Sequence, residues 1–172
     1  MGGTVRLVFV AVRGRSVVLV AIVLILAACS ASSPPKAGAR AGAVYDSIVR
    51  WFAQKDSTDP DPLPVYIEPR GEGVSIQLDV QAQLVKSTKD VATVRFIDTR
   101  DEALITKADG TVVVANDGIL LRLAPVVEQG NKVQLDVDLH DHDEVFTTMQ
   151  FNLTLVDGKW VIDKPPVDLP AG

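Results

Sequence analysis

The stretch QLDVDLHDHDE, residues 134–144, holds both histidines of the chain. If it forms a β-strand, Asp136, Asp138, His140 and His142 project from one face, because successive side chains alternate. Imidazole and carboxylate groups are ligands for zinc and other divalent ions. Same-face neighbours on a strand lie about 7 Å apart, however, so adjacent ones rarely converge on one ion. We therefore expect a solvated polar face without a tight metal site, and no cofactor; His140, His142 and Asp138 are the candidate ligands if a metal does bind.

A second group of reactive side chains lies in FIDTRDEA, which contains Asp98, Arg100, Asp101 and Glu102. Paired carboxylates can act as acid and base if burial separates their pKa values. Thr99 and Glu102 also have the spacing of a helix capping box, which predicts a short helical turn through residues 103–105. Because the cap accounts for Glu102 without catalysis, we assign no catalytic residue.

Other catalytic patterns are absent from the sequence. It contains no glycine-rich phosphate loop and no G-x-S-x-G nucleophile motif. The only cysteine, Cys29, stands where a long apolar run stops. A single cysteine also makes no intramolecular disulfide, so the folded part must be stabilised by its core.

The residues before Cys29 have the pattern of a secretory signal. Arg6, Arg13 and Arg15 precede an almost purely apolar run over residues 16–28, which ends in small residues. A membrane-spanning helix would need about 20 apolar residues, and the run is shorter than that. We therefore expect residues 1–28 to be a signal peptide.

The residues Leu26-Ala27-Ala28-Cys29 resemble the lipobox of bacterial lipoproteins, and the whole chain resembles lipoproteins of high-GC Gram-positive bacteria. The resemblance implies that a diacylglycerol is attached to the Cys29 thiol and that the chain is cut just before it. Two acyl chains give stable membrane attachment. The expectation is a cell-membrane protein on the extracytoplasmic side, with residues 29–42 as the lipidated cysteine and a flexible tether.

Charge narrows the choice of partners. All 22 acidic residues follow Cys29 but only 14 of the 17 basic residues do, so the mature chain carries a net charge of −8. That sign argues against binding nucleic acid and against electrostatic attraction to anionic lipid. About 144 residues remain after cleavage, enough for one domain, which we place at residues 43–165 with a frayed tail at 166–172.

The elements that would position these residues follow from hydrophobic spacing. Val44, Ile48, Trp51 and Phe52 form one apolar stripe, which predicts an amphipathic helix over residues 42–55. The stripe either packs on the domain's own sheet, which single-domain helices favour, or meets a partner. The next elements expected are strands at 64–69 and 91–97, with residues 77–87 between them favouring helix over an alternative strand.

From residue 108 onward the pattern predicts an antiparallel meander, because turn-forming pairs separate runs of strand-forming residues. These pairs are Asp109-Gly110, Asp117-Gly118, Gly130-Asn131 and Asp157-Gly158. Two of these runs place apolar side chains on one face: Val133, Leu135, Val137 and Leu139 in the first, and Val145, Met149, Phe151, Leu153 and Leu155 in the second. The class expected is α+β, with the helices on one face of a mostly antiparallel sheet and the other face in water. The hairpin over residues 155–163 resembles the last hairpin of nuclear transport factor 2-like and cystatin-like domains. This is a likeness of fold alone, and such folds include both enzymes and binding proteins.

These features favour a non-enzymatic binding or interaction module, held at the membrane by the lipid on Cys29. Its partner would be an envelope protein or a small ligand, not nucleic acid. The alternative is a small cone-fold enzyme, a hydrolase or isomerase, that uses acidic residues around Asp98 and Glu102 or a metal at His140 and His142. A pocket lined by those residues would favour the enzyme.

Overall fold

The structure is a computed structural model that describes residues 37–55, 61–140 and 146–170. The chain divides into two units, residues 1–33 and 34–172, and every described residue belongs to the second unit. Cys29, the residues before it and His142 therefore lie outside the described residues.

Helix α1 (Ala37–Lys55) begins five residues earlier than the sequence pattern predicts. Residues 37–42, which we expected in the tether, form its first turns. The correction has a physical reason: this segment is rich in alanine, the best helix former, and Ala41 already packs against the core. The expected apolar stripe is confirmed as a core face, because Ile48 is fully buried and Phe52 is 5% exposed.

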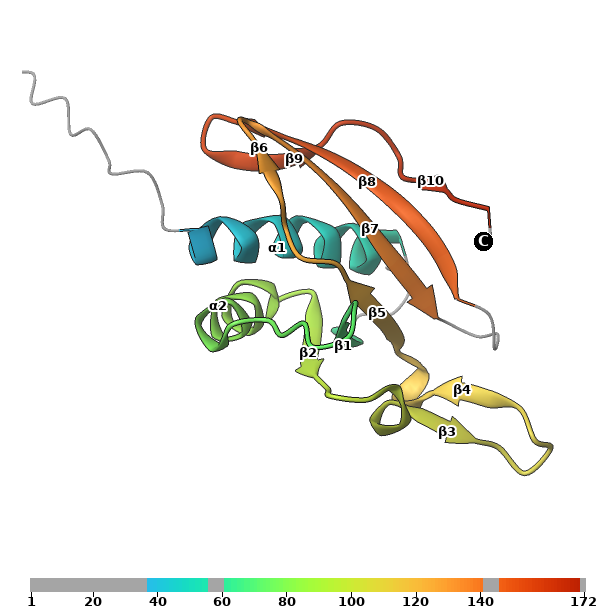
Figure 1. Ribbon diagram of the computed structural model, residues 1–172. Helices are drawn as coiled ribbons and strands as arrows, with labels where there is room; N and C mark the ends of the chain where they lie inside the picture. Colours follow the sequence, from blue (N-terminus) through green and yellow to red (C-terminus); the bar gives the residue numbers. More distant parts are fainter. Residues whose placement is uncertain (1–36, 56–60, 141–145, 171–172) are drawn as a thin grey trace, which may run out of the picture. The chain divides into compact units, whose positions relative to one another are not determined.

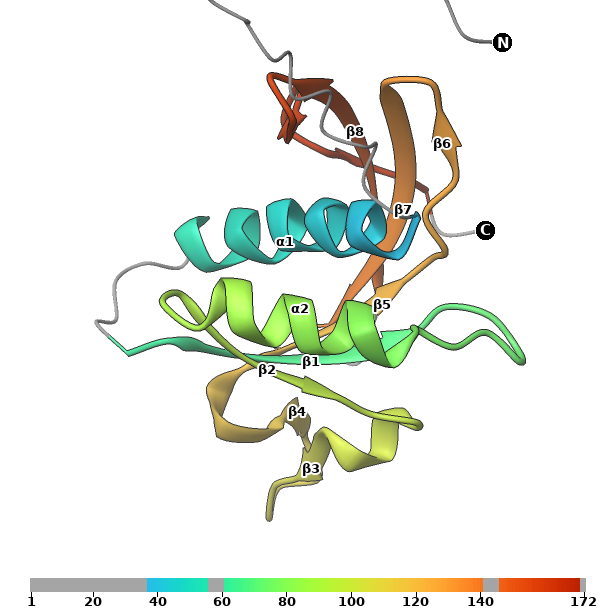
Figure 2. The same cartoon turned by 90° about the vertical axis from the view of Figure 1, so that its left-hand side faces the viewer.

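Helix α2 (Leu78–Thr88) confirms the helical choice for residues 77–87. Its buried side chains are Val80, Leu84 and Thr88, which stand four residues apart and so form one stripe. Figures 1 and 2 show α1 and α2 side by side on the same face of the sheet. The α+β class expected from the sequence is thereby confirmed.

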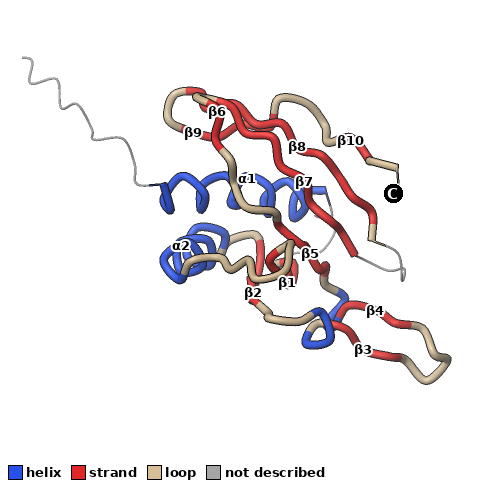
Figure 3. The backbone as a smooth tube through the Cα atoms, in the orientation of Figure 1, coloured by secondary structure: helices blue, strands red, loops and turns tan. Residues whose placement is uncertain are grey.

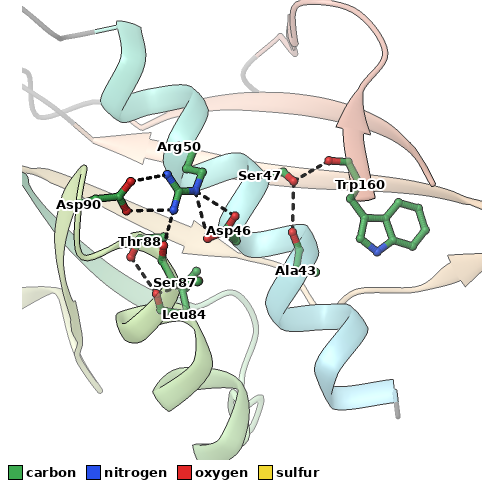
Figure 4. A network of polar contacts seen from close by, with 9 residues as sticks. All are labelled: Ala43, Asp46, Ser47, Arg50, Leu84, Ser87, Thr88, Asp90 and Trp160. Atoms are coloured by element: carbon green, nitrogen blue, oxygen red, sulfur yellow. Dashed lines mark hydrogen bonds and ion pairs between the residues drawn. The ribbon is translucent and has the colours of Figure 1, made fainter. Parts of the chain in front are cut away.

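Polar contacts fix α1 against its neighbours (Figure 4). The Arg50 guanidinium on α1 lies 3.1 Å from Asp46, 3.0 Å from Asp90 and also donates to the Ser87 carbonyl on α2. Hydrogen bonding to Arg50 lowers the pKa of the exposed Asp90 carboxyl from its ordinary value. On another side of α1, the Ser47 hydroxyl donates to the Trp160 carbonyl at 2.8 Å. These contacts connect α1 both to α2 and to the C-terminal part of the sheet.

The described residues contain ten strands, coloured red in Figure 3. They are β1 (Leu63–Pro69), β2 (Ala92–Phe96), β3 (Leu104–Thr106), β4 (Val112–Val114), β5 (Ile119–Leu123), β6 (Glu128–Gln129), β7 (Lys132–His140), β8 (Thr147–Val156), β9 (Lys159–Ile162) and β10 (Val167–Asp168). The main sheet runs in the order β10-β8-β7-β5-β1-β2, with β6 beside β7 and β9 beside β8.

Strand β1 is parallel to both of its neighbours, β2 and β5. Helix α2 connects β1 to β2, as a parallel pair requires a crossover connection. The strand is buried on both faces at its centre: Val65 and Ile67 belong to the main core, while Tyr66 belongs to a second cluster on the opposite face. The expectation of a sheet with one wholly wet face is therefore wrong at β1 and β5.

The second cluster forms where the β3–β4 hairpin covers the opposite face of the sheet (Figure 2). Its buried members are Tyr66, Ile97, Ala103, Val114 and Leu120. The helical turn expected through residues 103–105 is wrong in extent, because the turn η1 (Arg100–Glu102) ends before Ala103 and Leu104 already pairs in β3. The need to bury Ala103 and to pair Leu104 with Val114 outweighs the helical propensity of a three-residue turn.

The Asp117-Gly118 pair does not make the hairpin that its sequence suggests. It ends the turn η2 (Ala115–Asp117) and leads from β4 into β5, which belong to different sheets. Here glycine serves close packing, because a Cβ on Gly118 would lie 2.4 Å from the Pro64 carbonyl oxygen. The chain can pass β1 at this point only without a side chain.

The antiparallel run from β5 through β7 and β8 to β9 confirms the predicted meander from residue 119 onward. The first run of that prediction, β4, instead pairs with β3 in a separate sheet. Its core face carries Val133, Leu135, Val137, Met149, Phe151 and Leu153, as the alternation predicts; Val145 lies outside the described residues. The tail is not frayed throughout, because β10 pairs with Gln150 and Met149 and the Leu169 N–H donates to the Thr148 carbonyl. The edge of β8 offers backbone groups that this short strand satisfies.

Candidate functional site

A cleft of about 610 Å³ lies where the parallel strands end. The carboxyl ends of β1, β2 and β5 meet at one edge of the sheet, because the three strands are parallel. The lining of the cleft comprises Glu68 and Pro69 of β1, residues 71–76 after β1, Leu78 and Gln81 of α2, residues 96–98 and 102, and Arg122 of β5. Ligands of α/β sheets bind at this kind of edge, outside the carboxyl ends of the strands.

The loop between β1 and α2 forms one wall of the cleft. Gly71 and Gly73 adopt positive φ angles of 120° and 69°, which side-chain-bearing residues rarely adopt. The loop is fixed at its start, where the Arg70 N–H donates to the Leu123 carbonyl at 2.9 Å. The glycines thus let the chain turn sharply after β1 and leave open space beside the strand ends.

A chain of ion pairs leads from the cleft across the sheet. Arg122 Nε lies 3.2 Å from Glu68 Oε2, at ion-pair distance but without the geometry of a hydrogen bond. Arg122 Nη1 lies 3.5 Å from Asp138 Oδ2, and Arg70 Nε lies 3.0 Å from the same oxygen. Arg70 also reaches Asp136 at 3.4 Å. Each buried or half-buried charge here has an opposite charge beside it, as burial of ions requires.

The cleft remains acidic despite these pairs. Its lining includes four carboxylate side chains, Glu68, Glu72, Asp98 and Glu102, and a single cationic one, Arg122. Arg122 is already shared between Glu68 and Asp138. A ligand with a negatively charged group would therefore meet net repulsion, whereas an uncharged or cationic polar group would not.

The candidate acid–base residues meet at this cleft, since Asp98 and Glu102 both line it. The predicted capping box is present: Glu102 Oε1 accepts the backbone N–H groups of Asp98 at 2.9 Å and Thr99 at 3.1 Å. Asp98, Arg100, Asp101 and Glu102 are all exposed. The carboxylate of Glu102 thus stabilises the turn, and neither acid is buried.

The candidate metal ligands occupy a different environment from the one expected. Asp138 is 5% exposed and His140 is 2% exposed, so the prediction of a solvated face is wrong for these two residues. His140 stands opposite Leu120 of the second cluster, and its ring lies 5.1 Å from that of Phe146. Asp138 accepts from the Thr148 hydroxyl at 2.8 Å, in addition to its two arginines.

Within residues 37–55, 61–140 and 146–170, no group of three or more histidine, cysteine, aspartate or glutamate side chains is placed to hold a metal ion. His142 lies outside these ranges. The absence of a tight metal site at His140 and His142 stays a prediction.

Sequence reasoning missed Glu68, Arg70, Arg122 and Phe146. Arg122 interrupts the apolar run ILLRLAPVV, and a charge inside a buried strand is a signal that could have identified it. Phe146 lies under two guanidinium groups, with its ring centre 5.4 Å from Arg100 and 5.5 Å from Arg122. Such contacts favour a fixed position for both cations.

A smaller apolar groove of about 220 Å³ adjoins the cleft. Its lining comprises Ala41 and Tyr45 of α1, residues 74–77, Val80, Leu123, Pro125 and Val126. The Tyr45 hydroxyl donates to the Ala124 carbonyl at 3.0 Å, and burial raises the pKa of Tyr45 to about 12. No side chain of this lining is charged, so the groove suits an apolar occupant.

Comparisons with family models, with curated proteins and with solved structures find nothing that matches this chain. In the part of the chain that the structure describes, neither helix combines the length and the apolar character needed to cross a bilayer.

Proposed function

We propose that the mature protein is a lipid-anchored, non-enzymatic binding module on the extracytoplasmic side of the cell membrane. Its anchor is a diacylglycerol on Cys29, and its ligand occupies the cleft at the carboxyl ends of β1, β2 and β5. The lipobox-like residues Leu26, Ala27 and Ala28 support the anchor. The presence of a cleft at these strand ends supports the placement of the ligand there.

The observation that carries this proposal is the size and position of the cleft. At about 610 Å³ it falls within the range of about 300–1,000 Å³ typical of small-molecule sites. A further hollow of about 350 Å³ lies over β7 and β8, and its lining belongs to antiparallel strands instead. Of these two hollows, the cleft is the one at a parallel-strand edge, where ligands commonly bind.

A second candidate function is a small hydrolase or isomerase, because Asp98 and Glu102 both line the cleft. The capping role of Glu102 and the exposure of both acids favour binding over acid–base catalysis.

The test places a photo-crosslinking amino acid at Ser75 of the full-length chain in bacterial cells. Ser75 is exposed and lines the cleft, so a bound ligand should give an adduct detectable by mass spectrometry. The same probe at Asp157, an exposed position in the β8–β9 turn, measures random capture. Equal adduct yields at Ser75 and Asp157 would contradict the proposed site.

Glu102→Gln separates the two functions once a ligand is captured. An enzyme that uses Glu102 would convert its substrate at least a hundredfold more slowly in this variant, as loss of an acid or base does. A binding module would keep its captured ligand chemically unchanged in both proteins.

A further inference from the structure

The cleft and the apolar groove share one wall. Val74, Ser75 and Ile76 line both hollows, so a ligand in one lies across a single stretch of chain from the other. The cleft offers carboxylates and Arg122, whereas the groove offers alkyl groups and the Tyr45 ring. A molecule that filled both hollows would have a polar part and an aliphatic part.

Two unusually exposed apolar side chains adjoin these hollows. Leu78 lines the cleft and is 80% exposed, and it directly follows Gln77 of the groove lining. Val127 is 64% exposed and directly follows Val126, which also lines the groove. Apolar side chains left in water beside a groove mark a surface that meets an apolar partner.

The short length of chain between Cys29 and α1 indicates that this apolar partner comes from the membrane. Seven residues separate Cys29 from Ala37, and the eight Cα-to-Cα steps between these two residues span at most about 29 Å. Ala41, which lines the groove, lies about 6 Å further along the helix. A diacylglycerol on Cys29 would therefore keep the groove within about 35 Å of the membrane surface, where lipid is the most abundant apolar molecule.

We infer that the ligand is a membrane lipid whose head group occupies the cleft and whose acyl chain occupies the groove. The inference rests on the proposed function, because both the anchor and the ligand site belong to it. The net charge of the cleft lining selects an uncharged or cationic head group, since an anionic one would meet Glu72 and Asp98. The contact is made by apolar side chains, which agrees with a mature chain of net charge −8.

The experiment places the photo-crosslinking amino acid at Leu78 and, separately, at Val127 in the full-length chain in bacterial cells. The matched controls are Ile105 and Val161, which are 49% and 48% exposed and line neither hollow. We expect lipid adducts at Leu78 and Val127 at least fivefold above both controls. Adducts with proteins alone, or equal lipid yields at all four positions, would overturn the inference.

A blocking variant tests whether the crosslinked lipid lies in the groove or only in the bilayer nearby. Ser75→Trp fills the shared wall from an exposed position, and Thr93→Trp adds the same side chain at an exposed position of β2 outside both hollows. Ser75→Trp should lower the lipid adduct at Val127 at least fivefold, whereas Thr93→Trp should leave it unchanged. An unchanged yield in Ser75→Trp would mean that the lipid lies outside the groove and would overturn the inference.

Mass spectrometry of the Cys29 peptide and of the adducts distinguishes failure of the lipid inference from failure of the proposed function. A Cys29 peptide without diacylglycerol would remove the anchor and with it the proposed function. A lipidated Cys29 together with a non-lipid adduct at Ser75 would agree with the proposed function. It would overturn only the inference that the ligand is a lipid. Anionic phospholipid as the main adduct would likewise overturn the selection of the head group.

Discussion

Asp138 organises the polar side chains on the face of the sheet opposite the helices. Its carboxylate is 5% exposed and contacts Arg70, Arg122 and the Thr148 hydroxyl. A buried charge without partners costs several kcal/mol, so these contacts are a condition of its burial. Through Arg122 the same carboxylate helps to fix Glu68, which lines the cleft. One residue thereby connects the position of β7 to the electrostatics of the candidate site.

Tyr45 gives a prediction about alkaline pH at the residue scale. Burial raises its pKa from 10.0 to about 12, so the folded state favours the neutral phenol. The resulting stability is complete below pH 10 and is lost as the pH rises from 10 to about 12. At about 1.36 kcal/mol per pH unit, the loss amounts to roughly 3 kcal/mol. Urea unfolding followed by the fluorescence of Trp51 and Trp160 measures this loss.

Tyr45→Phe is the control for that titration. It removes the hydrogen bond to the Ala124 carbonyl and should cost about 1 kcal/mol at neutral pH. Above pH 10 it should lose less stability than the natural protein, because no phenol remains at position 45. Parallel losses in both proteins between pH 10 and 12 would show that another group causes the alkaline transition.

At the scale of elements, α1 stabilises the domain through its apolar stripe. Phe52 is 5% exposed and packs on Phe151 of β8, with ring centres 5.8 Å apart, and on Trp51 at 4.9 Å. Phe52→Ala should therefore lower the free energy of unfolding by about 3 kcal/mol or more, the usual cost of truncating a buried phenylalanine. Val85→Ala, on the exposed side of α2, is the control and should cost under about 1 kcal/mol. A cost for Phe52→Ala as small as that of the control would contradict the packing seen here.

The elements that periodicity could identify are those with one buried face. The stripes of α1 and α2 and the alternation of β7 and β8 predict their type and their core side chains. The parallel pairing of β1 could not be predicted in this way, because a period of two fixes which side chains share a face and not the direction of the neighbouring strand. The burial of His140 was missed for a related reason. The β3–β4 hairpin and Phe146 cover that face, and both arise from pairings far apart in the sequence.

The candidate site likewise combines residues that local sequence could identify with residues that only long-range strand pairing brings together. Asp98 and Glu102 could be identified because both lie in the short segment FIDTRDEA, in which Glu102 also completes the capping box. Glu68 and Arg122 come from strands 54 residues apart and meet only because β1 and β5 pair. A cleft at strand ends is a property of topology, so a sequence without a predicted parallel strand could not locate it.

At the scale of the whole molecule, anchor and cleft would act together. A tether of eight residues before α1 gives a lipidated protein little freedom to leave the membrane surface. The proposed ligand is concentrated at that same surface. A protein released from the membrane would lose access to the proposed ligand.

Cys29→Ala tests the anchor directly. A single acyl chain gives only marginal membrane binding and two give stable attachment, so loss of the thiol that would carry the diacylglycerol should abolish stable attachment. We expect the variant to accumulate as uncleaved precursor or as secreted protein, and Ser30→Ala, which keeps the lipobox, to stay in the membrane fraction. Fractionation alone is insufficient, because an uncleaved precursor still carries the apolar run at residues 16–28. The mass of the N-terminal peptide resolves this, and a Cys29→Ala chain that begins at residue 29 and remains with the membranes would show that something other than the lipid holds it there.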